Sequence, residues 1–161
     1  MTDSQENQES AIPEGEAIEI KHVDLATEEQ GHKVSLKESD KTQGQMEMYV
    51  GGTEFASIAK ELGLIEPPRP LTHEIYLKLV SGLGISFQKL EIYGMEENAF
   101  LARLYYTKSE QPKMMEIRPS DGLALALNKK TPIFIHKRLL KGTLSPQDQD
   151  TLNDLVKSVK F

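Results

Sequence analysis

The amino-acid sequence predicts a single compact α+β domain, with a mostly antiparallel or mixed sheet, two to three packed helices and a C-terminal helix. The length of 161 residues is enough for one domain and short for two. Stretches in which apolar and polar residues alternate come in pairs joined by turn residues, as in hairpins. Stretches with apolar residues at helical spacing separate these pairs, which is typical of α+β domains.

The N-terminal third of the chain is expected to hold a tail and three strands. Residues 1–16 have few apolar side chains and no basic one, so we predict a disordered acidic tail. Alternation from Ala17 onward predicts two strands joined by a hairpin turn at residues 29–31. Residues 46–50 repeat the alternation and predict a third strand.

Two helices are expected next. After Gly51, apolar residues at i, i+3, i+4 and i+7 predict a first helix, and Gly63 is placed to end it in a left-handed cap. The second helix is predicted to begin with Thr72 as its N-cap. Its apolar residues lie along one side: Ile75, Tyr76, Leu79, Val80 and Leu83. The prolines between the two helices keep that connection extended.

The rest of the chain is expected to add strands and two more helices. The predicted strands cover residues 85–93, 99–107, 114–117 and 133–135. Residues 123–127 are apolar on every side, which predicts a short buried helix. A serine followed by proline at positions 145 and 146 indicates the start of a last helix. We therefore predict a domain over residues 17–141 and a C-terminal helical extension over residues 142–161.

Composition excludes several classes of protein. The chain has no cysteine, which excludes disulfides, thiolate zinc sites and a cysteine nucleophile. No stretch approaches the roughly 20 apolar residues that cross a bilayer, so no membrane contact is expected. The N-terminus lacks the basic and apolar regions of a secretory signal, and we expect a cytoplasmic location.

The net charge of −6 is unevenly distributed along the chain. Residues 1–31 carry nine acidic residues and one lysine, a net charge of −8, which leaves +2 for the remainder. A nearly neutral body predicts weak, salt-sensitive binding to nucleic acid. The one dense basic cluster is equally well explained as a solvated edge: Lys129, Lys130, Lys137, Arg138 and Lys141.

Two Arg-Pro segments distinguish the sequence. The first reads RPLTHE from Arg69, and the second reads EIRPSDGLALA from Glu116. With VGGTE from Val50, they resemble the bifunctional nuclease family over roughly Ile18 to Leu140. The resemblance implies a compact α+β domain that tends to self-associate, as a dimer or a larger homo-oligomer. It also implies activity on both DNA and RNA, the property that gave the family's plant members their name.

The sequence departs from the family pattern at four positions. Glu74 stands where an aspartate commonly follows the histidine, and Glu116 and Ile117 stand where Asp-Ala is usual. Gly122 replaces a small residue, commonly alanine. Each glutamate keeps the charge of aspartate but lengthens the arm by a methylene, so a metal geometry tuned to aspartate is not assured.

Phosphodiester hydrolysis needs an activated water and charge neutralisation on the phosphate. The motifs hold residues of the required types. His73 is a candidate general base or metal ligand, and Glu74, Glu116 and Asp121 are candidate catalytic carboxylates that would hold Mg²⁺ or Mn²⁺. No organic cofactor is expected.

Phosphate binding is assigned to other residues of the same motifs. Arg69 and Arg118 are candidates to bind phosphate oxygens in a bidentate manner. Ser120 and the backbone N–H groups at the start of the following helix would extend that anion site. Glu54, at the start of another helix, could join the cluster.

Each of these residues also has a structural interpretation. Ser120 and Asp121 would meet the dipole of a helix that begins at Pro119. Arg118 could pair with Glu116 or Glu74, and His73 could satisfy a backbone carbonyl. The two motifs each open a helix with a similar set of residues, however, and that favours one shared polar site.

Two functions from different classes follow. The first is a metal-assisted nuclease of low sequence specificity that favours single strands. The second is a non-enzymatic oligomeric interaction or regulatory module, in which the Arg-Pro segments build an interface or bind a small anionic ligand. Convergent carboxylates in an open cleft would favour the enzyme, whereas Arg118 buried against Glu116 or Glu74 under another subunit would favour the module.

Overall fold

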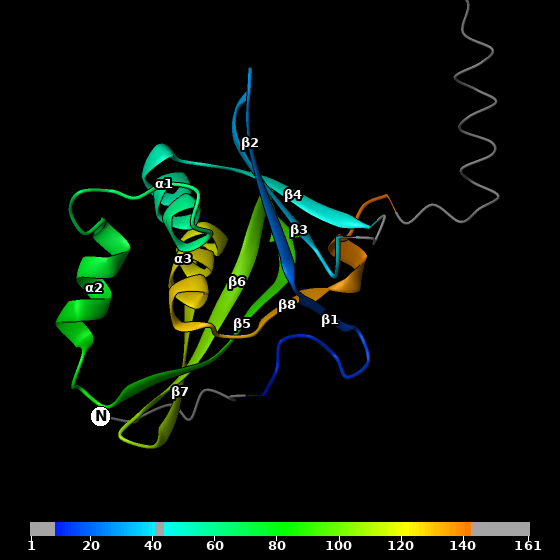
Figure 1. Cartoon of the computed structure of the whole chain (residues 1–161). Coiled ribbons are helices and arrows are strands. Elements are labelled where there is room, and N and C mark those ends of the chain that lie inside the picture. The colour runs from blue at the N-terminus through cyan, green and yellow to red at the C-terminus, as the bar shows by residue number, and fades with distance from the viewer. Residues whose placement is uncertain (1–8, 41–43, 143–161) are drawn as a thin grey trace, which may run out of the picture.

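The computed structural model describes residues 9–40 and 44–142 of the chain and confirms the α+β class (Figure 1). Its elements in chain order are β1 (Ala17–Ile20), β2 (His22–Glu28), β3 (Gly31–Lys37), β4 (Gln45–Val50), α1 (Gly52–Glu61), α2 (Thr72–Val80), β5 (Ile85–Glu96), β6 (Ala99–Lys108), β7 (Gln111–Ile117), α3 (Pro119–Lys129), β8 (Ile133–His136) and the 3-10 turn η1 (Lys137–Leu139). The predicted helices and strands of the described part are present, and most are longer than the patterns indicated. The first predicted strand, however, is divided into β1 and β2, which belong to different sheets.

The strands form two sheets. The larger has the order β1-β8-β5-β6-β7, and the smaller has the order β2-β3-β4. All neighbouring strands are antiparallel except β5 and β8, which are parallel. The prediction of a mostly antiparallel or mixed sheet is therefore confirmed, with the strands divided between two sheets.

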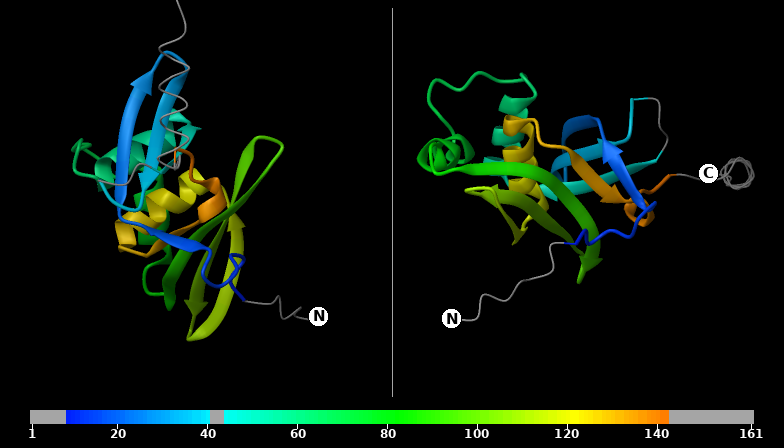
Figure 2. Two further views of the ribbon diagram at one scale, coloured as in Figure 1. Left: turned by 90° about the vertical axis from the view of Figure 1, so that its right-hand side faces the viewer. Right: turned by 90° about the horizontal axis from the view of Figure 1, so that it is seen from below.

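Helices α1 and α3 lie between the two sheets and share one core with them (Figure 2). Ile58 of α1 and Leu123 of α3 are fully buried, as are Leu36 of the small sheet and Ile92 of the large one. Helix α3 packs on α1 and on β5 and β6. The helix that was predicted from residues 123–127 is thus the central element of the domain.

Helix α2 packs differently from the prediction. Its buried side carries His73 and Leu77, which face α3 and α1. The apolar side that was expected to pack inward is largely solvent-exposed: Ile75, Tyr76, Leu79 and Leu83. The helix also begins one residue earlier than predicted, with Leu71 in the cap position and Thr72 as the first helical residue.

The N-terminal segment contradicts part of the predicted tail. Ile12 is only 2% exposed. The carboxylate of Glu91 on β5 accepts hydrogen bonds from the Ser10 hydroxyl and from the Ala11 N–H. Residues 9–12 therefore pack against the large sheet, because Ile12 and the polar partners of Glu91 give that segment buried contacts, whereas residues 13–15 are exposed. The predicted C-terminal extension lies outside the described residues, apart from Gly142.

None of the described helices is long and apolar enough to cross a membrane.

Candidate functional site at the amino ends of three helices

The first turns of all three helices meet at one place. Glu54 is the third residue of α1, His73 the second of α2 and Asp121 the third of α3. Arg118 occupies the cap position of α3, and Pro119 at the next position sets the helical start. The amino end of a helix favours negative charge, so two carboxylates can lie close together here at a reduced cost.

A chain of hydrogen bonds fixes His73. Its Nδ1 lies 2.7 Å from the Ser57 hydroxyl, and its Nε2 lies 2.9 Å from Asp121 Oδ1. An ionised carboxylate can only accept, so we assign the ring proton to Nε2 and let Nδ1 accept from the Ser57 hydroxyl. His73 is 7% exposed, and both ring nitrogens are engaged within the fold.

Arg118 joins the two carboxylates from the solvent side. Its Nε donates to Asp121 Oδ2 and its Nη2 donates to Glu54 Oε1, both at 2.8 Å. The Arg118 side chain is 69% exposed. Burial alone would raise the pKa of Asp121, but the hydrogen bonds from Arg118 and His73 outweigh burial and hold the pKa below its ordinary value. Asp121 is therefore ionised at neutral pH.

Gly51 makes room for Glu54. A Cβ atom at position 51 would lie 2.5 Å from the Glu54 carboxylate. The missing side chain lets that carboxylate fold back over the chain and reach Arg118. Gly51 thus has a direct steric role in the polar cluster, which consists of Glu54, His73, Arg118 and Asp121.

A cavity of about 490 Å³ adjoins the exposed side of the cluster. Its walls come from residues 47–51 of β4 and its end, residues 98–100 of the β5–β6 turn, and residues 118–120. Arg118, Ser120 and the first turn of α3 therefore face one open hollow between the two sheets. Its volume falls within the range of small-ligand sites in proteins.

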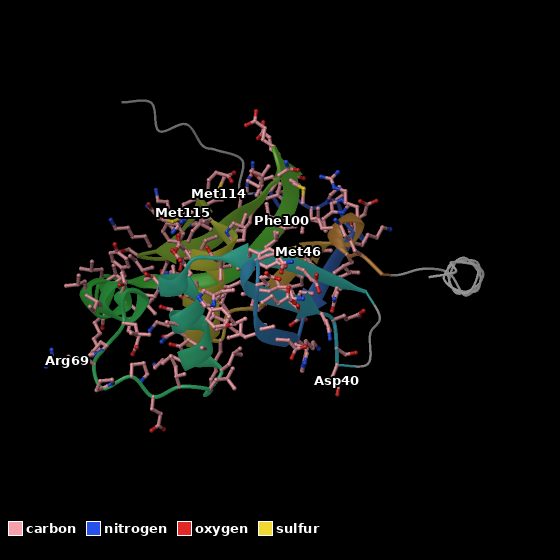
Figure 3. All side chains as sticks on the ribbon, turned by 90° about the horizontal axis from the view of Figure 1, so that it is seen from above. Asp40, Met46, Arg69, Phe100, Met114 and Met115 are labelled. Atoms are coloured by element: carbon pink, nitrogen blue, oxygen red, sulfur yellow. The ribbon has the colours of Figure 1, made fainter. Side chains whose placement is uncertain are left out.

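The other predicted site residues lie elsewhere. Glu74 accepts from the Leu71 N–H at 3.2 Å and pairs with Lys60 at 3.0 Å, and the Lys60 ammonium lowers the pKa of Glu74. Glu116 is paired with Arg103, which lies directly opposite on β6. Arg69 is exposed in the loop before α2 and points away from the domain (Figure 3).

The predicted three-carboxylate metal set is consequently not assembled in this structure. Asp121 lies in the cluster, whereas Glu74 and Glu116 are held by Lys60 and Arg103. Within residues 9–40 and 44–142, no group of three or more His, Asp or Glu side chains is placed to hold a metal ion. The expected pairing of Arg118 with Glu116 or Glu74 is also wrong, since its partners are Glu54 and Asp121.

Sequence reasoning missed Ser57. It lies inside α1, one turn after Glu54, and no motif marks it. His73 was expected to satisfy a backbone carbonyl if its role were structural, but its partners are side chains. Only the packing of α1 against α2 brings the Ser57 hydroxyl to the ring.

The fold and the site define an α+β domain with a polar cluster at helix amino ends. The bifunctional nuclease domain model matches residues 34–147, so this chain belongs to the bifunctional nuclease family. It is 32% identical over 135 residues to an uncharacterised protein found in two strains of Mycobacterium tuberculosis, a match that covers 82% of this chain and 80% of that protein. It is 25% identical over 111 residues to bifunctional nuclease 1 of Oryza sativa subsp. indica, covering 67% of this chain and 34% of the rice protein.

Proposed function

We propose that this chain is a cytoplasmic nuclease that hydrolyses phosphodiester bonds of DNA and RNA with low sequence specificity. One observation carries the proposal: two ionisable carboxylates, Glu54 and Asp121, converge on an exposed arginine at an open cavity. Arg118 and Ser120 bind the phosphate, assisted by the N–H groups of the first turn of α3. Family membership supports this chemistry, because the rice relative bears the name of a nuclease.

The charge of the cluster favours a divalent cation. The two carboxylates of Glu54 and Asp121 outnumber the one guanidinium of Arg118 that pairs with them, which leaves a local formal charge of −1 for these three groups. A phosphodiester also carries one negative charge, so a cation is needed to offset the repulsion between the cluster and the phosphate. Mg²⁺ binds through one or two carboxylates, with water and substrate phosphates as its other ligands. Glu54 and Asp121 fit that requirement once Arg118 turns to the phosphate, and the bound ion would supply an acidic water at neutral pH.

His73 acts as a positioning residue. Its Nε2–H donates to Asp121, and its Nδ1 is occupied by Ser57, so it has no free lone pair for a substrate water. It holds one oxygen of Asp121 and leaves the other to Arg118. We therefore assign the proton-accepting role to the carboxylates and a supporting role to the imidazole.

The shape of the cavity favours single strands. It lies in a hollow between β4 and the turn joining β5 and β6, and its volume suits one nucleotide more than a duplex. Residues 32–161 carry a net charge of only +2, well below the strongly basic charge typical of duplex-binding domains. A flexible single strand can place one of its phosphates beside Arg118 without contacting a broad basic surface.

A second function is a non-enzymatic module that binds a small anionic ligand at the same place. One observation favours it: Glu54, His73, Asp121 and Arg118 already satisfy one another by hydrogen bonds. In that case Arg118 and Ser120 bind the anion, and no bond is broken.

The decisive experiment measures cleavage of single-stranded DNA and RNA with Mg²⁺ or Mn²⁺. It compares the wild type with Asp121→Asn and Arg118→Gln. The matched control is Arg103→Gln, because Arg103 is also an arginine paired with a carboxylate but lies away from the cavity. We expect metal-dependent cleavage that falls by about a hundredfold in the two site variants and is unchanged in the control.

Two other results are informative. Equal loss in Arg118→Gln and Arg103→Gln would show that the site lies elsewhere on the chain. Absence of cleavage by the wild type with either metal, combined with phosphate binding that requires Arg118, would reject the nuclease and favour the binding module.

A further inference from the structure

The cavity beside the polar cluster has walls of different chemistry. Among the described residues that line it, Arg118 is the one cation, and Ser120 lies with it at the start of α3. Glu47 is the one acidic lining residue, and Lys33 lies 3.5 Å from its carboxylate. The wall formed by residues 98–100, which we call the hairpin wall, carries no charge. A phosphate is therefore best held at the α3 end of the cavity, and the hairpin wall suits an uncharged group.

Phe100 is the aromatic residue of the hairpin wall. It lies on the same side of β6 as Ala102 and Leu104, which are buried. Its own side chain is half-buried, because it packs against the hydrophobic core and also lines the cavity. The core therefore supports one part of the ring and leaves another part open to a ligand. A ring held in this way is a rigid surface on which a flat molecule can stack.

Tyr49 is the other aromatic residue that lines the cavity, but its ring is engaged elsewhere. Along β4 it alternates with the buried Met48, so the Tyr49 side chain lies on the opposite side of the small sheet from the core. Its hydroxyl donates to Glu28 of β2 at 2.8 Å. Among the lining residues, Phe100 is thus the aromatic side chain that faces the cavity.

The register of β6 and β7 places Phe100 near the phosphate end of the cavity. Ala102 is paired with Ile117, the last residue of β7, so Phe100 lies two residues further along β6, beside the start of α3. Neighbouring strands are about 5 Å apart, and two residues of a strand span about 7 Å. In a nucleotide the sugar separates the phosphate from the base. One nucleotide that lies along the cavity can therefore reach both Arg118 and Phe100.

We propose that Phe100 binds the nucleobase by stacking, with the phosphate of the same nucleotide at Arg118. The inference rests on the proposed function, because it requires that the cavity receives a nucleic-acid strand. Stacking uses the π-face that every base has, so it strengthens binding without selecting a sequence. It also needs an unstacked base, which a single strand offers and a duplex does not. Phe100 thus supplies both the low sequence specificity and the preference for single strands.

The test compares the binding of adenosine 5′-monophosphate and of ribose 5-phosphate to the full chain in the presence of Mg²⁺. The two ligands share the sugar and the phosphate and differ only in the base. Neither contains a phosphodiester bond, so binding is measured without cleavage. We expect the wild type to bind the nucleotide about tenfold more tightly than the sugar phosphate in an NMR titration. The adenine proton signals should move upfield, because the base lies over an aromatic ring.

The variants separate the ring of Phe100 from its role in the core. Phe100→Leu keeps an apolar side chain but removes the ring, so it should bind the two ligands with affinities within about twofold of each other and without the upfield shift. Phe100→Tyr keeps the ring and should retain the preference for the nucleotide. The matched control is Tyr106→Leu, because Tyr106 is also a half-buried aromatic residue on the same side of β6 but lies outside the cavity. That control should bind both ligands like the wild type.

The results that would overturn the inference differ in what else they reject. Equal affinity of the wild type for the two ligands, with both affinities lost in Arg118→Gln, would reject base stacking and leave the phosphate site in place. An equal loss of both affinities in Phe100→Leu, with a lower thermal midpoint, would show that Phe100 acts only through the fold. Binding of neither ligand to the wild type would reject the cavity as a nucleotide site and the proposed function with it.

Discussion

Gly122 shows how strictly one position of α3 is fixed by its neighbour. A Cβ atom there would lie 2.6 Å from Leu90 Cδ1 and 3.2 Å from Cδ2. Leu90 is fully buried on β5 and belongs to the core cluster, so its side chain has little room to move. The sequence pattern marked position 122 only as a place for a small residue. The close approach of α3 to β5 explains why it is glycine here.

We predict that Gly122→Ala destabilises the protein. Alanine gains about 1 kcal/mol in helix propensity, but forcing a methyl group into a packed core costs about 1–3 kcal/mol. The expected net loss is roughly 1 kcal/mol, measured as the free energy of unfolding in urea. Combining it with Leu90→Val should cost less than the sum of the two single changes. A stabilised single variant, or strict additivity, would show that Leu90 is not the constraint.

At the scale of elements, the start of each helix could be predicted only in part. Pro119 and Asp121 indicated the start of α3, and the RPLTHE segment from Arg69 indicated the start of α2. The inner side of α2 could not be predicted, because apolar residues occupy both sides and a histidine reads as polar. Glu116 was assigned to the site as a neighbour of Arg118 in sequence. The β6–β7 register places it opposite Arg103 instead.

The cluster ties the three helix starts together most strongly when Asp121 is ionised. Its pKa is held below the ordinary value in the folded protein, mainly by Arg118 and His73 acting against burial. A lowered carboxyl pKa contributes stability at higher pH, and that stability is lost as the pH falls through the folded pKa. We predict that the free energy of unfolding declines from about pH 5 downward and that Asp121→Asn flattens this decline.

The same variant should be less stable than the wild type at neutral pH. Chemical unfolding at a series of pH values measures both effects. If the free energy of unfolding of Asp121→Asn fell with decreasing pH as steeply as that of the wild type, the ion pair between Asp121 and Arg118 would contribute nothing to folding stability.

At the scale of the whole molecule, two sheets enclose α1 and α3, and the candidate site opens where the sheets meet. The fold class and the chemistry-bearing motifs could be predicted from the sequence, because periodicity and Arg-Pro signals are local. The place of Glu54 at a helix start suggested that it could join the cluster, but its pairing with Arg118 and the role of Ser57 could not be predicted, since 64 residues separate Glu54 from Arg118 and only the packed helices bring them together. The burial of Ile12 could not be predicted either, because it depends on contacts with distant residues and the sequence around Ile12 is polar.

The central claim is that nucleic-acid phosphates bind at the amino ends of the three helices. It is tested most directly by backbone amide NMR of the 18.1 kDa chain titrated with a short single-stranded oligonucleotide and Mg²⁺. The account predicts the largest shifts at Glu54, His73, Ser120 and Asp121, and their loss in Arg118→Gln. Shifts concentrated around Arg103 and Glu116 on the outer face of the sheet, and unchanged in that variant, would contradict it.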